Sequence, residues 1–320
     1  MNSDTTESTI EATRTIPRAF ARRRLHSLMG LWLSIYIIIH LFTNSQAALF
    51  IGDDGQGFIR AVNAIQEMPY LPLIEIAILA VPILIHMIWG IHYAMNAKYN
   101  SFGKTGHTPY LPEYSRNHAY TWQRITAWIL VFGLVAHIVH MRFIEHPVGA
   151  FKGTQQYYMM RVTSDPGLYT LGQRLGVDIY DEDKILAAKN ALLKASSEAD
   201  HSSIEKQKHH EEVYFVAALE KRPLSKGDVI AVANNFGTAE LLMLRDTFKM
   251  PIMLALYTLF VLTACFHAFN GVWSFMFKWG ITLSERSQRV MRGITTVLMV
   301  GVTALGLSAI WLTYWINLKQ

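Results

Sequence analysis

The amino-acid sequence predicts an all-α membrane protein, a bundle of five transmembrane helices that carries a helical insertion outside the membrane. Two observations predict the bundle: 51% of the 320 residues are hydrophobic and only 17% are charged, and five apolar stretches are long enough to cross a bilayer. A third observation predicts the insertion, because a mixed-charge segment of about 100 residues separates the third apolar stretch from the fourth.

The fourth apolar stretch is the clearest of the five. From Ile252 to Phe277 it contains no Asp, Glu, Lys or Arg, and 26 helical residues exceed the thickness of the hydrocarbon core. The first stretch follows three arginines and resembles a cleaved signal peptide, but its length favours a span. The expected spans are residues 28–50, 72–97, 122–144, 251–277 and 290–316. They divide the chain into an N-terminal tail (1–24), three helices (25–146), the insertion (147–248) and a final helix pair (249–320).

Positive charge gathers on alternate connections between these spans, and five spans place the two termini on opposite sides. The short connection between spans one and two holds Arg60 against Asp53, Asp54 and Glu67. The positive-inside rule therefore places the N-terminus and the connections 2–3 and 4–5 in the cytoplasm. The basic residues behind this assignment are Arg14, Arg18, Arg22, Arg23, Arg24, Lys98, Lys104, Arg116, Arg124, Lys278, Arg286, Arg289 and Arg292.

The insertion lies outside the membrane in this topology. Its sequence has helical patterns near 182–197 and 203–220, and a further helix is expected at 238–248. We expect the insertion to pack on the bundle, with His201, His209 and His210 in solvent. The single cysteine, Cys265, lies within a span, which excludes a disulfide framework and a cysteine-based metal site.

Four histidines fall deep inside four different spans, where an ionisable group calls for a partner or a ligand. At about 1.5 Å per residue, His40 and His137 lie at one depth in the outer half of the bilayer, and His86 and His267 lie together in the inner half. Two imidazoles level on facing helices are the axial ligands of a bis-histidine haem. Gly90 and Gly271 follow the inner pair by one turn, which leaves room for a flat macrocycle.

Other interpretations of these histidines remain. A buried histidine alone more often bonds a backbone or side-chain partner, but four in two level pairs favour a cofactor. His140 lies one turn beyond His137 and is the rival ligand on span three. His92 lies close to the cytoplasmic surface and suits a propionate or interfacial contact, and His26 is expected at the membrane entrance, some 20 Å from His40 along the helix.

Several strings resemble the dihaem cytochrome b anchor of succinate dehydrogenase, the single-chain bacterial type called cytochrome b558. They cover all five spans, and the strings around His267 and Arg289 are the most specific. The strings are RRLHSLMG (23–30), IIHLFTN (38–44), IEIAILAVPILIHMIWGIHYAMNAK (74–98), WQRITAWILVFGLVAHIVHMR (122–142) and FHAFNGVWSFMFKWGITLSERSQR (266–289).

The resemblance implies two b haems in a bacterial cytoplasmic membrane, the distal one on His40 and His137 and the proximal one on His86 and His267. It also implies electron transfer between an iron–sulfur subunit, which works with an FAD flavoprotein, and a membrane quinone, either menaquinone or ubiquinone. Lipid is the remaining expected partner, and no nucleic acid is expected. Two features depart from the family: the long insertion, and Cys265 where some relatives carry a Glu used for proton movement.

Polar residues near the outer end of the bundle are candidates for the quinone site or for contacts to haem propionates. Glu75 lies one turn inside span two, where it either serves a quinone or pairs with Arg142. Arg142 and His146 are candidates to neutralise distal propionates. The full candidate set is Glu75, Asn44, His140, Arg142 and His92. The basic residues Arg22, Arg23, Arg24, Lys98, Arg124 and Arg289 are candidates to dock the iron–sulfur subunit, or they reflect the positive-inside bias alone.

Two further function classes compete with this one. A haem-b anchor of another respiratory oxidoreductase would also show paired histidines, but it would lack the strings around His267 and Arg289. A proton-coupled transporter would use buried histidines in a relay, and it should show internal repeats or acids within the membrane. The sequence shows neither internal repeats nor such acids, apart from an H-x-x-x-G pattern that occurs in both span two and span four.

Overall fold

A computed structural model describes residues 17–50, 52–97, 101, 111, 113–197, 203–221 and 223–316. Most of the expected N-terminal tail, and with it Arg14, therefore lies outside the described residues, as do Lys98, Lys104 and His201.

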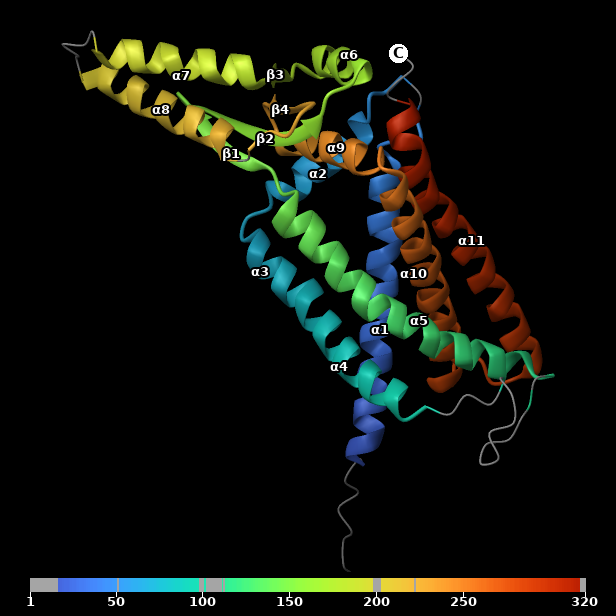
Figure 1. The fold of residues 1–320 in the computed structure, drawn as a ribbon. Helices are drawn as coiled ribbons and strands as arrows, with labels where there is room; N and C mark the ends of the chain where they lie inside the picture. Colours follow the sequence, from blue (N-terminus) through green and yellow to red (C-terminus); the bar gives the residue numbers. More distant parts are fainter. Residues whose placement is uncertain are drawn as a thin grey trace, which may run out of the picture.

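Five helical segments long and apolar enough to span a membrane form the bundle, which confirms the predicted all-α membrane architecture (Figure 1). Two of the spans continue through π-helical turns, so that the second span joins α3, η1 and α4 and the third joins α5 and η2. The bundle segments are α1 (Arg18–Ser45), α3 (Leu71–Glu75), η1 (Ile76–Ala80), α4 (Val81–Met95), α5 (Ser115–Ile138), η2 (Val139–Ile144), α10 (Pro251–Lys278) and α11 (Glu285–Ile316).

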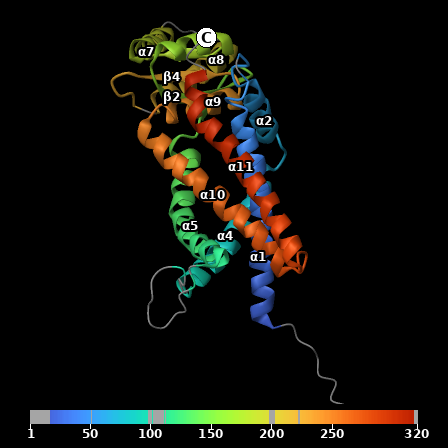
Figure 2. The same ribbon diagram turned by 90° about the vertical axis from the view of Figure 1, so that its right-hand side faces the viewer.

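The spans alternate in direction, so each end of the bundle collects a defined set of helix ends. The start of α1, the end of α4 and the junction of α10 with α11 lie at one end, and the insertion covers the other (Figures 1 and 2). The basic residues of α1 and of the junction thus share the end that faces away from the insertion. We refer to the two ends as the basic end and the insertion end.

The insertion is a mixed α/β unit, and the expectation of a purely helical insertion was incomplete. Helices α7 and α8 confirm the two main helical patterns, and α9 confirms the third within two residues. A four-stranded antiparallel sheet in the order β1-β2-β4-β3 was not predicted. The elements are β1 (Val148–Lys152), β2 (Gln155–Thr163), α6 (Pro166–Leu175), β3 (Asp178–Tyr180), α7 (Glu182–Ser197), α8 (Ser203–Glu220), β4 (Asp228–Ala233) and α9 (Phe236–Thr247).

The sheet is covered on both faces, which hides its periodicity in the sequence. Strand β4, DVIAVA, is a short apolar run without alternation because residues 229–233 are all buried. A fully buried strand cannot be told from a helical segment by periodicity. Along β4, Val229 and Ala231 enter the core under α6 and α9, and Ile230 and Val232 enter the core under α7 and α8.

The insertion and the bundle share one continuous core. Helix α9 packs against α2 (Gln56–Gln66), an amphipathic helix in the connection between the first two spans that the sequence did not predict. The backbone N–H of Gly237 donates to Oδ1 of Asn63 at 2.7 Å, and a Cβ on Gly237 would lie 2.5 Å from the carbonyl oxygen of Ile59. The close approach of the two helices therefore requires glycine at this position.

A buried ion pair within the insertion lies against the bundle. Arg245 of α9, only 1% exposed, donates to both carboxylate oxygens of Asp165, the residue that caps α6, at 2.7 and 3.0 Å. Lys249 reaches the same carboxylate at 2.5 Å, and the Arg245 guanidinium lies over the ring of Tyr314 in α11. The prediction that the insertion packs on the bundle is confirmed.

Candidate bis-histidine site

The outer pair of intramembrane histidines lies side by side between α1 and α5. The ring centroids of His40 and His137 are 6.0 Å apart, and their planes are inclined by 75°. His140, the rival on the same helix, instead faces Tyr257 of α10 at 6.4 Å. The structure therefore brings together the two histidines that the depth count paired.

The inner pair lies between α4 and α10 with nearly the same geometry. The ring centroids of His86 and His267 are 6.2 Å apart, and their planes are inclined by 85°. His86 packs on Gly30 of α1, ten residues from His40, so the two pairs are stacked about 15 Å apart along that helix. Four of the five spans contribute one of these histidines, and α11 contributes none.

Three of the four rings are held at Nδ1 by a group that can accept a hydrogen bond. The Nδ1 atom of His86 lies 3.0 Å from the carbonyl oxygen of His26, that of His267 lies 3.2 Å from Oγ1 of Thr126, and that of His137 lies 3.3 Å from the hydroxyl of Tyr257. His40 differs, because its Nδ1 lies 3.5 Å from the amide nitrogen of Asn44.

In His86, His137 and His267 this hydrogen bonding leaves the other ring nitrogen, Nε2, available. Among the described residues, Nε2 of His40, His86, His137 and His267 makes no hydrogen bond. A histidine that binds a metal commonly donates its second ring N–H to a carbonyl or hydroxyl, which fixes the tautomer and the ring orientation. The inner pair and His137 have this arrangement.

His26, expected as an interfacial residue at the membrane entrance, contacts the inner histidine pair, which the sequence did not predict. Its ring stacks on that of His86 with 4.2 Å between centroids, and its Nε2 is buried without a hydrogen-bond partner in the described structure. Helix α1 begins at Arg18, so His26 lies two turns inside the helix, level with His86 of α4. A Cβ on Gly90 would meet this Nε2 at 3.5 Å.

A polar network joins α5 and α10 beside the inner pair. Gln123 donates to the carbonyl oxygen of His267 at 3.0 Å, and Asn270 donates to Oε1 of Gln123 at 2.6 Å. These residues come from the strings WQRIT and FHAFNG. The gap left by Gly271 faces the same glutamine, whose Nε2 would lie 3.7 Å from an added Cβ. The network fixes the turn of α10 that carries His267.

The arrangement favours a ligand that itself supplies most of the coordination to a metal. The described residues hold no cluster of three or more His, Cys, Asp or Glu side chains that could bind a metal ion. A bare metal ion in a protein usually needs three or four protein ligands. Two isolated imidazole pairs are therefore suited to a metal whose other four positions are filled by a macrocycle.

The outer candidates lie near the insertion end of the bundle. Arg142 donates to Glu75 at 3.0 Å across the two π-helical turns, so of the two roles weighed for Glu75 the structure shows the ion pair. Asn44 donates to the carbonyl oxygen of His40 at 2.8 Å, within its own helix. The Nδ1 atom of His140 lies 3.5 Å from the hydroxyl of Tyr257, which sequence reasoning had not singled out.

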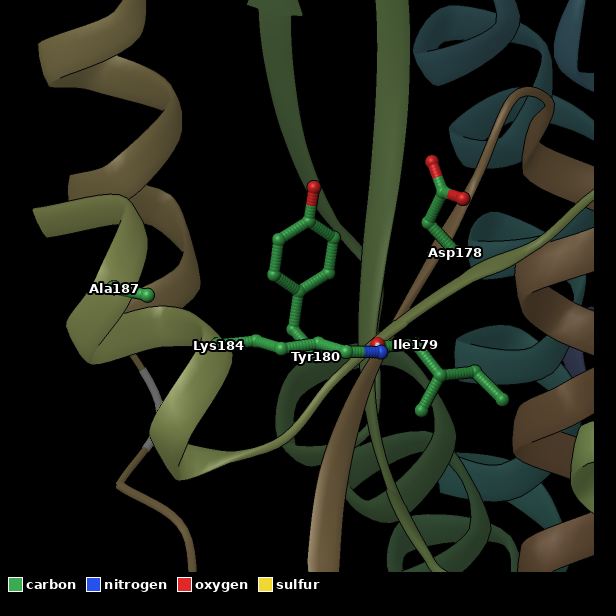
Figure 3. A pocket seen from close by; sticks show the side chains of 5 residues that line it. All are labelled: Asp178, Ile179, Tyr180, Lys184 and Ala187. Carbon is green, nitrogen blue, oxygen red and sulfur yellow. Dashed lines mark hydrogen bonds between the residues drawn. The ribbon is translucent and has the colours of Figure 1, made fainter. Parts of the chain in front are cut away.

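Two pockets lie away from the histidine pairs. One, of about 160 Å³, is at the basic end and is lined by Arg22 and Arg23 of α1 and by Trp89, His92 and Tyr93 of α4. His92 is exposed there, as expected for an interfacial residue. Figure 3 shows the other, an open pocket of about 340 Å³ in the insertion, where Lys184 donates to the carbonyl oxygen of Ile179 at 2.9 Å.

Comparison with known proteins gives a curated relative. The chain is 24% identical over 295 residues to the succinate dehydrogenase cytochrome b558 subunit of Bacillus subtilis, with 92% of this chain and 96% of that protein covered. No protein-family model matches the chain. No solved structure matches it. The curated relative, matched along nearly the whole length of both chains, thus belongs to the family that the sequence strings indicate, the cytochrome b558 subunits of succinate dehydrogenase.

Proposed function

We propose that this chain is the dihaem cytochrome b anchor of a succinate:quinone oxidoreductase and passes electrons between an iron–sulfur subunit and a membrane quinone. The observation that carries the proposal is the pair of stacked histidine pairs, each with its Nε2 atoms free of hydrogen bonds in the described structure. The similarity to a succinate dehydrogenase cytochrome b558 subunit supports the choice of complex.

The separation of the paired rings fits a metal held between them. Imidazole nitrogens bind metals at about 2.0–2.1 Å, so two rings on opposite sides of one metal have centroids roughly 6.3 Å apart. The observed separations are 6.0 and 6.2 Å. His40 with His137 and His86 with His267 would hold the two haems, which when bound supply one-electron carriers stacked across the bilayer.

The chain's own residues orient these ligands and keep water away from them. Thr126 and the backbone of His26 fix the inner rings, and Tyr257 fixes His137. His26 and Gln123 offer polar groups beside the inner site, where they would meet the acidic edge of a haem. A low-dielectric surrounding strengthens such charge-assisted bonds.

The basic end would face the cytoplasm and receive the iron–sulfur subunit. Arg24 packs over Trp279 and donates to the carbonyl oxygen of Lys278, which joins the start of α1 to the end of α10. Arg22 and Arg23 line the pocket at the basic end, where they would be available to an acidic surface of that subunit. The concentration of arginine at this end supports a cytoplasmic N-terminus.

The quinone would bind at the opposite end, near the outer histidine pair. His140 is the best-placed residue for it, because its Nδ1 lies 3.5 Å from the Tyr257 hydroxyl that also contacts the candidate ligand His137. The ion pair of Glu75 and Arg142 forms part of the surrounding rim. Each of the remaining candidates, Asn44 and His92, has another role in the structure, the first in its own helix and the second at the basic end.

The proposal is tested by purifying the tagged chain from membranes with its partners. We expect a flavoprotein and an iron–sulfur protein to co-purify, and succinate to reduce a water-soluble quinone. His86→Ala should abolish the reduction of quinone, while reduction of an artificial dye by the flavoprotein persists. The proposal would be contradicted if the chain purified without these partners, or if the complex with His86→Ala reduced quinone at the full wild-type rate.

A further inference from the structure

The insertion places a buried carboxyl group at the outer end of the third span. Glu240 of α9 has a side chain that is only 16% exposed, and its Oε1 lies 4.0 Å from Nδ1 of His146, which follows η2. Phe236, one turn earlier on α9, packs on the ring of the same histidine. Glu240 is thus an acidic residue of α9 that faces the third span at a position where burial favours apolar side chains.

The insertion also covers the end of the third span. Met141 of η2 packs into the core between β2, β4, α6 and α9, and the ion pair of Arg142 with Glu75 lies beside it. The outer end of α5 therefore does not open directly to solvent along α9. The interface between α9 and η2 is therefore one place where a side chain could connect the region of His140 with the outer solution.

Few charged or titratable groups act on Glu240. His146 faces it from the loop after η2, and Arg142 acts on it electrostatically from η2. Tyr158 of β2 packs on Phe236, and Glu67, at the end of α2, acts on Tyr158. Burial raises the pKa of Glu240 to about 7, and the nearby charge of Arg142 only partly opposes this effect. The carboxyl group can therefore take up and release a proton near neutral pH.

We propose that Glu240 is the proton-exchange residue of the quinone site, which links that site to the outer solution through His146. The inference rests on the proposed function, and it assigns to the insertion a role that the histidine pairs do not. Reduction of a quinone to a quinol takes up two electrons and two protons, and the complex supplies only the electrons. A residue with a titrating carboxyl group at the covered end supplies the protons.

The transfer uses groups that the structure places together. A small rotation of the imidazole closes the 4.0 Å gap between Glu240 and His146. The carboxyl O–H bond then breaks as an N–H bond forms at Nδ1, which gives a carboxylate and an imidazolium. The imidazolium releases a proton from Nε2 toward a quinone oxygen, and the outer solution returns a proton to the carboxylate. Quinol oxidation follows the same steps in reverse.

The test compares Glu240→Gln and Glu240→Asp with Glu220→Gln in the purified complex. Glu220 is the matched control because it is an exposed acid of the same insertion, paired with Lys189. We expect Glu240→Gln to lower quinone turnover at least about tenfold at pH 7 and to remove the pH dependence near neutrality. Glu240→Asp and added formate should restore part of the turnover, and dye reduction should stay unchanged in all variants.

Infrared difference spectra across a pH titration give a readout that does not depend on turnover. We expect a protonated carboxyl band that disappears near pH 7 in wild type and in Glu220→Gln, and that is absent from Glu240→Gln. Wild-type turnover and pH profile in Glu240→Gln, or the lack of such a band in wild type, would overturn the inference. Failure of the proposed function can be distinguished from failure of this inference, because in that case the wild-type complex itself would reduce no quinone.

Discussion

The hydroxyl of Tyr257 lies between two histidines of the third span, 3.3 Å from Nδ1 of His137 and 3.5 Å from Nδ1 of His140. Because α10 supplies this hydroxyl, a helix that carries an inner candidate ligand also orients an outer one. The two histidines have different neighbours, since the ring of His137 contacts both His40 and Tyr257 while that of His140 contacts Tyr257. Several of the predictions below follow from this division between ligands and the groups that position them.

Tyr257→Phe should leave both haems bound and raise the midpoint potential of one of them. The hydroxyl accepts a hydrogen bond from Nδ1 and makes the imidazole a stronger donor to iron, which favours the oxidised state. Loss of a bond worth about 1 kcal/mol corresponds to a shift of up to roughly 40 mV for a one-electron couple. A redox titration followed optically measures it. Thr126→Val, which removes the contact to His267, should instead shift the midpoint potential of the inner haem.

Gly30→Ala should disturb the inner site alone. A Cβ at this position would lie 2.8 Å from Cε1 of His86, so the imidazole must move away from the carbonyl oxygen of His26 that holds it. We expect the haem content to fall from two toward one per chain, while the haem at the outer histidine pair keeps its spectrum. Gly293→Ala is the matched control in a helix, since a Cβ there meets nothing within 4 Å. An unchanged spectrum in Gly30→Ala would show that His86 needs no such space.

Arg245→Met should destabilise the insertion and weaken its contact with Tyr314 of α11. Removal of Arg245 leaves the Asp165 carboxylate with Lys249 as its remaining cationic partner. We therefore expect a loss of stability that is clear but below the about 3–5 kcal/mol that a buried charge left without any partner costs. Thermal unfolding and limited proteolysis in detergent measure the effect. Arg161→Met is the control, because its pair with Asp228 is longer, at 4.0 Å, and partly exposed. That variant should lose less than about 1 kcal/mol. Equal losses in the two variants would contradict the assignment.

The same ion pair predicts how the insertion responds to acid. Burial alone would raise the pKa of Asp165, but the hydrogen bonds and charges of Arg245 and Lys249 hold it well below its usual range. A depressed carboxyl pKa adds stability above the unfolded value of about 3.9, and this stability is lost as the pH falls through the folded value. Unfolding temperature should therefore drop below about pH 4 in wild type, and it should depend less on pH in Asp165→Asn.

Much of the bundle can be read from the sequence because its signal is long and local. The sequence predicts the fourth span at 251–277, and the helix runs from Pro251 to Lys278. The long interval without charged residues is sufficient to predict these bounds. The neighbour relations of His40 with His137 and of His86 with His267 were also predictable, since alternating helix direction converts residue number into depth.

The features that the sequence did not reveal depend on tertiary contacts. The strand β4 is apolar on both faces, so its run of residues carries no period of two. Tyr257 contacts His137 where α10 crosses α5, and no residue spacing within either helix predicts this contact. Glu240 likewise looks like an ordinary exposed acid of an amphipathic helix until α9 is packed against the end of the third span.

The most direct test of the account is the haem content of the purified chain, by pyridine haemochrome quantitation and reduced-minus-oxidised spectra. The measurement compares wild type with His40→Ala and His86→Ala, and His140→Ala serves as the control on the third span. We expect two b haems per chain in wild type and in the control, and the loss of a different single haem in each of the other two variants. A chain without haem, or one whose single haem is lost only in His140→Ala, would contradict the pairing of His40 with His137 and of His86 with His267.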